Sequence, residues 1–114
     1  AMKNLMGIVW DRKFWHSNDL HQCIADFCTL IKPHINIIDA YNVMKKNGPR
    51  GVSVDDVENM KYQIISTDIV AADTGATKIF GMQPDDIPYI SIADKMGIGS
   101  KNLDNLAIKR INIT

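Results

Sequence analysis

The chain has 114 residues, of which 46% are hydrophobic and 23% are charged, a balance typical of one globular domain. This composition excludes an intrinsically disordered chain and a multidomain enzyme. Thirteen basic and thirteen acidic residues give a formal charge of zero, so we expect neither a nucleic-acid nor a membrane partner. No apolar run approaches the roughly 18 residues of a membrane span and no export signal is recognisable, which predicts a soluble, cytoplasmic protein.

A first helix is predicted from Leu20 to about Lys32, after the capping sequence Ser17-Asn18-Asp19. Cys23 and Cys28 lie on its apolar face, where we expect them to pack in the core. Two cysteines do not fill a structural zinc or iron–sulfur site, and the histidines have no metal-ligand spacing. We therefore predict no metal site and no cofactor bound by this chain.

The middle of the chain predicts a strand, a loop, a second strand and a helix. The strands are expected at 35–39 and 62–66, the polar Gly/Pro loop at 45–51, and the helix at 69–80, with Gly81 ending it. Twelve of the thirteen acids are aspartate, which favours caps and turns, so many of them are expected to end or begin elements.

The last third predicts one more helix and an edge strand. The helix opens at Gln83-Pro84-Asp85-Asp86, bends or restarts at Pro88, and closes at Gly97 and Gly99. An imperfect alternation from Leu106 to Ile113 is typical of an edge strand. The expected fold is a single compact α/β domain over residues 1–114, with helices packed on a mostly parallel sheet of three or four strands.

The first candidate site is the loop that contains Asn47, Gly48 and Arg50. Glycine lets main-chain N–H groups approach a ligand, and arginine grips a carboxylate or phosphate with two parallel bonds. This pattern favours binding of a small anion. The same residues also suit a plain solvated turn, and the spacing of a nucleotide-binding loop is absent.

The second candidate site is the helix start formed by Ser66, Thr67 and Asp68. Unpaired N–H groups and the helix dipole favour negative charge at such a start. If both sites followed neighbouring parallel strands, they would meet in one crevice. Alternatively, the Asp68 carboxylate itself occupies the helix start as the N-cap.

Asp73 is the candidate for catalysis, because the helical pattern places it on the apolar face with Ile69 and Phe80. A buried carboxylate there would serve as a general base or cation ligand. The alternative is a buried structural bond to neighbouring main-chain N–H groups, or to Arg50, which would fix the loop. A further alternative for the chain is an interaction module, in which Trp10, Phe14 and Trp15 form an exposed patch or pack in the core.

Six short stretches together resemble the carboxyl-terminal part of the domain-of-unknown-function family 362 (DUF362). The match covers nearly the whole chain in the same order. The stretches are Lys3-Asn4-Leu5-Met6-Gly7, Asp19-Leu20-His21-Gln22 with Ile24-Ala25-Asp26, Ile37-Ile38-Asp39-Ala40, Asn47-Gly48-Pro49-Arg50-Gly51, Ser66-Thr67-Asp68 with Val70-Ala71-Ala72-Asp73, and Asp86-Ile87-Pro88-Tyr89-Ile90.

The resemblance implies association with iron–sulfur redox proteins, since longer members are often described as iron–sulfur centre proteins. Members usually have a longer amino-terminal portion, so we expect a fragment or truncated carboxyl-terminal part. An iron–sulfur cluster would then lie in an upstream portion, and an upstream domain or redox partner is expected. The leading hypothesis is a domain that contributes an anion-binding loop and helix start but no cluster ligands. The alternatives are a small enzyme that uses Asp73 as base, or an interaction module.

Overall fold

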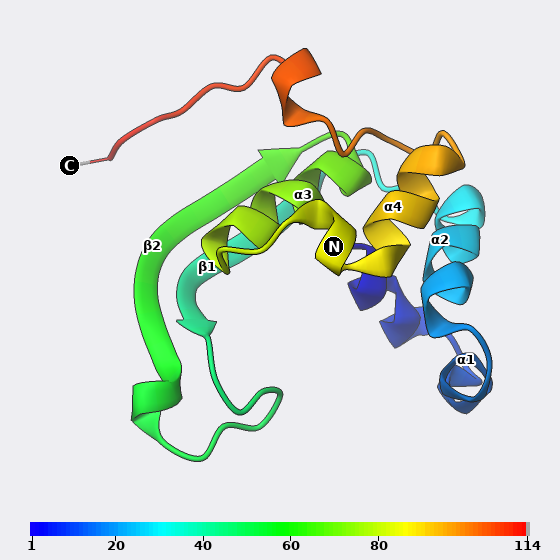
Figure 1. Cartoon of the computed structure of the whole chain (residues 1–114), viewed down its shortest axis with the longest axis horizontal. Coiled ribbons are helices and arrows are strands. Elements are labelled where there is room, and N and C mark those ends of the chain that lie inside the picture. The colour runs from blue at the N-terminus through cyan, green and yellow to red at the C-terminus, as the bar shows by residue number, and fades with distance from the viewer. Residues whose placement is uncertain (114) are drawn as a thin grey trace.

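The computed structural model describes residues 1–113, which form helices around one small antiparallel sheet (Figure 1). The helices are α1 (Arg12–Ser17), α2 (Leu20–Leu30), α3 (Ile69–Ile79) and α4 (Pro88–Lys95), and the strands are β1 (Asn36–Met44) and β2 (Val57–Ser66). Four short 3-10 helices join them: η1 (Met2–Ile8), η2 (Val54–Asp56), η3 (Pro84–Asp86) and η4 (Leu103–Asn105).

The predicted helices and their caps are confirmed. The Asp19 carboxylate accepts from the N–H of Gln22 at 3.0 Å and begins α2. After α3, Gly81 adopts a positive φ of 68°, the left-handed geometry that ends helices. Pro88 restarts the chain as α4 directly after η3. Local capping chemistry therefore fixes these boundaries.

The prediction of a mostly parallel sheet with three or four strands is wrong, because the sheet among residues 1–113 has two antiparallel strands. Asn36 pairs with Ser66 at one end, and Met44 pairs with Val57 at the other. The connection 45–56 holds only the short η2, whereas a parallel pair needs a crossover, usually through a full helix. Both strands are also longer than predicted, because β1 continues to Met44 and β2 already begins at Val57. These added parts mix exposed polar residues with apolar ones, so they do not show a clear strand pattern.

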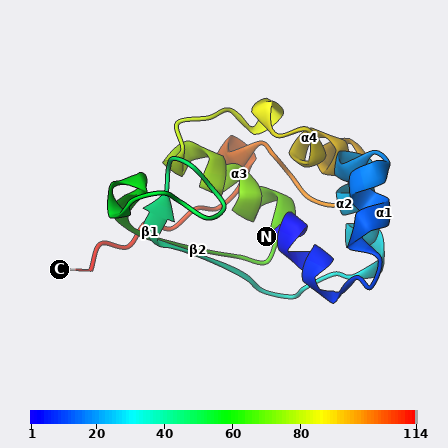
Figure 2. The ribbon, with the colours of Figure 1, turned by 90° about the horizontal axis from the view of Figure 1, so that it is seen from below.

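A bulge bends this sheet. Between the paired positions Ala40–Tyr62 and Asn42–Asn59, β2 has two residues where β1 has one. Lys61 lies in this bulge with a positive φ of 57°. Figure 1 shows the long strands curving around α3, and Figure 2 shows α3 on one side of the sheet. On the opposite face, the paired Ile37 and Ile65 stay exposed.

The predicted edge strand at 106–113 is also wrong, since this segment has no strand assignment. It leaves η4 and runs on without a ladder partner (Figure 1). A groove separates residues 106–110 from β2, and an alternating pattern makes a strand only when a neighbour completes its hydrogen bonds.

The core lies between η1, α2, α3 and α4 rather than under the sheet. Cys28 is fully buried there and Cys23 is partly buried against it, which confirms the predicted packing role of both thiols. Burial is the main cause that raises the pKa of Cys28 to about 11, so the thiol stays protonated at neutral pH. The fully buried members with large side chains are Met2, Ile24, Cys28, Val70 and Ile90.

Asp73 is buried in this core with only 5% of its surface exposed. Its carboxylate accepts from the N–H of Met2 at 2.9 Å and forms an ion pair with the amino group of Ala1. Asp73 therefore has the structural role of the alternative, but its donors belong to the start of the chain and are neither neighbouring N–H groups nor Arg50. Asp73 thereby fastens η1 to α3.

Replacing this carboxylate removes the acceptor for two buried donors. We expect Asp73→Ala to lower the free energy of unfolding by about 2–4 kcal/mol in urea denaturation. Asp26→Ala is the matched control. The side chain of Asp26 is exposed and accepts a hydrogen bond from Gln22, one turn earlier on the same helix. The control should change stability by at most about 0.5 kcal/mol. Equal effects of the two substitutions would contradict the role given to Asp73.

Candidate functional site

The two predicted ligand sites lie at opposite ends of the sheet. The loop 45–56 follows the end of β1, whereas Ser66 ends β2 beside the start of β1. The ten residues of β2 separate them, a span of roughly 30 Å at 3.3 Å per residue. The single crevice that a parallel sheet would have formed is therefore absent from the described chain.

The loop is organised from inside by Asp56, a residue that the sequence analysis missed. The Asp56 carboxylate accepts from the N–H groups of Val52 at 2.6 Å and Ser53 at 3.0 Å, and from the Asn47 amide at 2.8 Å. The main-chain bonds from Val52 and Ser53, followed in size by the Asn47 bond, hold the pKa of Asp56 below its usual value. The spacing Ser53-x-x-Asp56 was the available signal, because it is a capping box.

Asp56 changes what the loop offers to a ligand. Two of its main-chain N–H groups and the Asn47 amide already point at an internal anion. Gly51 is required for this arrangement, since its φ is 70° and an added Cβ would lie 3.0 Å from the Met44 methyl group. Arg50 and Gly48 remain exposed on the outside of the loop. Anion binding by Asn47, Gly48 and Arg50 therefore stays a prediction.

The start of α3 is likewise filled by its own carboxylate. One oxygen of Asp68 accepts from the N–H groups of Val70 at 2.8 Å and Ala71 at 2.9 Å. Its other oxygen accepts from the N–H of Ser100 at 2.8 Å. The alternative in which Asp68 is the N-cap is therefore observed. Asp68 also ties α3 to the turn that precedes the carboxyl-terminal segment.

That turn depends on a glycine that the sequence analysis read only as a helix end. An added Cβ on Gly99 would lie 2.1 Å from a carboxylate oxygen of Asp68, far inside any real contact. Gly97 provides the preceding left-handed position with a φ of 72°. Only a residue without a side chain lets the turn approach the helix start this closely.

Ser66, Thr67 and Asp68 line a groove of about 700 Å³ between β2, α3 and the carboxyl-terminal segment. Figure 1 shows this segment leaving η4 beyond the end of β2. The groove brings together one of the two predicted sites with residues that the sequence analysis did not assign to any site. Its apolar lining includes Met60, Ile64, Ile79, Leu103, Leu106 and Ile108.

The free charge of this groove is positive. Lys78 lies on its α3 wall, and Lys109 and Arg110 lie on the carboxyl-terminal segment. These three side chains are exposed and form no ion pair within residues 1–113. The acid of the lining, Asp68, is held by three main-chain N–H groups. An anion entering the groove therefore meets unpaired cations.

Asp73 lies in the core, outside the lining of this groove. Its role as a general base or cation ligand stays a prediction.

A separate polar cluster joins Ser91, Asp85 and Lys101, with the Lys101 nitrogen 2.5 Å from Asp85 and 3.4 Å from the serine hydroxyl oxygen. The hydrogen bond to Asp85 raises the pKa of Lys101, which favours its cationic form.

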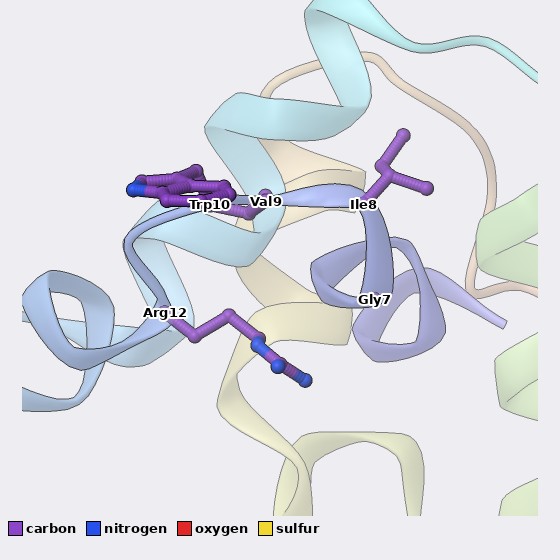
Figure 3. A pocket seen from close by; sticks show the side chains of 5 residues that line it. All are labelled: Gly7, Ile8, Val9, Trp10 and Arg12. Carbon is purple, nitrogen blue, oxygen red and sulfur yellow. The ribbon is translucent and has the colours of Figure 1, made fainter.

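The aromatic residues near the amino terminus divide between core and surface. Trp15 is buried and meets the ring of Phe27 edge-on at 5.3 Å. Trp10 is fully exposed and Phe14 is largely exposed. Figure 3 shows Trp10 and Arg12 beside a shallow pocket with their side chains pointing in different directions. The core and the surface expectations each hold for part of the group.

Within the described residues, no group of three or more His, Cys, Asp or Glu side chains is placed to hold a metal ion. The absence of a bound cofactor and the cytoplasmic location stay predictions. None of the helices described for residues 1–113 combines the length and the apolar character that crossing a membrane requires.

Residues 1–78 match the family model described as Domain of unknown function (DUF362). The chain belongs to this family. The resemblance seen in the sequence is thereby confirmed at the level of family, although the DUF362 match ends at residue 78 and does not include the sixth stretch at 86–90. The match includes both predicted ligand sites and Asp73. The family description gives no reaction, and the iron–sulfur association of this DUF362 chain stays a prediction. No curated protein and no solved structure matches the chain.

The contact between Gly99 and Asp68 gives a direct test of the groove's closed end. We expect Gly99→Ala to lower the free energy of unfolding by about 1–3 kcal/mol in urea denaturation, because the added methyl group displaces the capping carboxylate. Gly7→Ala is the control, since an added Cβ there has no atom within 4 Å and should cost no stability. A neutral Gly99→Ala would show that the cap does not depend on this close approach.

Proposed function

We propose that this domain binds a small organic anion with an apolar body in the groove between β2, α3 and the carboxyl-terminal segment. The observation that carries the proposal is the groove of about 700 Å³ that joins an apolar lining to three cations without an acidic partner among residues 1–113. Ligand pockets commonly occupy about 300–1,000 Å³ and combine mostly apolar walls with a few polar groups that orient the ligand.

The lining suggests how such a ligand would lie. Ile64 and Gly75 meet at the floor, where an added Cβ on Gly75 would lie 3.3 Å from the isoleucine. A flat apolar body would pack against this floor and Ile79. A carboxylate, sulfonate or phosphate would face Lys78 and Arg110. Ser66 and Thr67 supply further hydrogen-bonding groups at the end held by Asp68.

This proposal keeps Ser66 and Thr67 of the predicted helix-start site as lining residues, but it places the anionic group at the cations of the groove, because Asp68 already occupies the main-chain N–H groups of the helix start. The loop with Arg50 is the competing location. In a longer iron–sulfur redox protein, as the family resemblance implies, this domain would hold the ligand while an upstream portion carries the cluster. The chain itself contributes no cluster ligands in this proposal.

Naphthalene sulfonate is a suitable probe, because it joins a flat apolar body to one anionic group. We expect the double variant Lys78→Gln with Arg110→Gln to bind it about tenfold more weakly in calorimetric titration, since two unpaired cations are lost. The matched control is Lys46→Gln with Arg50→Gln, which removes the same charge from exposed positions on the loop.

The control should bind with unchanged affinity. Weaker binding by the loop variant alone would assign the anion site to Arg50 and contradict the groove. Equal weakening of both variants would show that binding follows net charge and not a site. Naphthyl methanol, which lacks the charge, should bind the original protein more weakly than naphthalene sulfonate and should be indifferent to both double variants.

A further inference from the structure

We propose that the carboxyl-terminal segment 106–113 is a strap that adds to the free edge of β2 as a third strand and thereby closes the groove. The gating part of this inference rests on the proposed function. The strand addition stands on its own observations, which concern the edge of β2, the surface of the segment and the point where the segment is anchored.

The outer edge of β2 has unused hydrogen-bonding groups. In an antiparallel pair, every second residue of a strand directs its main-chain groups away from its partner. Within residues 1–113, β2 has β1 as its only strand neighbour. A two-stranded ribbon is marginally stable in water, and an open edge is a template for another strand. The regular part of this edge is Tyr62–Ser66, beyond the bulge at Lys61.

The segment carries apolar side chains that its present position leaves in water. Ile108 is 47% exposed, Ile111 is 70% exposed and Ile113 is 95% exposed. Isoleucine favours strands because its branched side chain packs well on a pleated surface. In a docked strand, Ile108 would lie on one face of the sheet and Ile111 and Ile113 on the other, each beside side chains of β2. Docking would also supply the ladder that the alternating sequence lacks.

The anchor of the segment lies at the correct end of β2. Asp68 holds the N–H of Ser100 at 2.8 Å, and Asp94 holds the N–H of Lys101 at 2.9 Å. From η4 the chain runs past the end of β2 (Figure 1). Residues 106–110 line one side of the groove. A strand that starts there lies antiparallel to β2 and needs no crossover.

Closure would remove the site proposed above. Ile108 and its neighbours would move onto the edge that borders the groove, and the cations Lys109 and Arg110 would move with them. Ligand and strap therefore compete for the same space. The apparent affinity for a ligand is then reduced by the fraction of molecules in the closed state.

Residue-resolved amide hydrogen exchange tests the strand addition. A docked strap protects consecutive amides over Tyr62–Ser66, whereas a free edge leaves every second amide unprotected. Ile108→Pro removes a donor and blocks the ladder, so it should restore the alternating pattern. Ile108→Val keeps a strand-forming residue and should keep the consecutive pattern.

An alternating pattern in the original protein would overturn the strand addition. Protection that grows with protein concentration would assign the third strand to a second copy and would also overturn an intramolecular strap. For the gate, Ile108→Pro should bind naphthalene sulfonate at least about threefold more tightly than Ile108→Val. Equal affinities with different exchange patterns would contradict gating alone. If neither variant binds the probe, the proposed function fails while the exchange pattern still decides the strand.

Discussion

The hydrogen bonds that Asp68 accepts hold together the parts of the molecule that make the candidate site. One carboxylate oxygen accepts hydrogen bonds from the N–H groups of Val70 and Ala71 at the start of α3. The other accepts from the N–H of Ser100, which lies 32 positions away in the sequence. Without this link, the turn at Gly97 and Gly99 would lose the hydrogen bond that holds it against the start of α3. The carboxyl-terminal segment would then not be placed beside β2, and the groove would lose one wall.

The same physical device recurs at Asp56 and Asp73. Each carboxylate is buried and accepts main-chain N–H groups that have no acceptor in their own segment, Val52 and Ser53 in the loop for Asp56 and Met2 at the start of η1 for Asp73. Buried N–H groups without acceptors are costly, and an ionised acceptor gives stronger bonds than a neutral one. The near absence of glutamate fits this use, because the short aspartate side chain reaches its own loop.

The parts of the fold that were predictable from the sequence are those set by local chemistry. Asp19 and Asp68 as caps, Gly81 as a helix end and Pro88 as a restart each act within a few residues. The direction of the two strands was not predictable in this way. It depends on the route of the connection 45–56. The loop is held in shape by Asp56, which lies outside the glycine-containing motif 47–51.

The candidate site was half predictable for a related reason. Ser66 and Thr67 follow from the strand-to-helix boundary, which sequence patterns identify well. The cations of the groove could not be predicted in this way. They line one site only because the fold places α3 and the carboxyl-terminal segment around β2, which brings together Lys78, Lys109 and Arg110. The edge strand predicted from the alternation in 106–113 was wrong, because a strand is defined by pairing across long sequence distances and the alternation does not specify a neighbour.

Internal carboxylates occupy the loop and the helix start, so that an external anion is left with the groove. Amide chemical-shift changes during titration with naphthalene sulfonate would locate the bound anion. We expect changes in β2, in α3 near Gly75 and Lys78, and in 103–110, with the loop 45–56 unaffected. Changes centred on Asn47 to Gly51, with the groove silent, would contradict it.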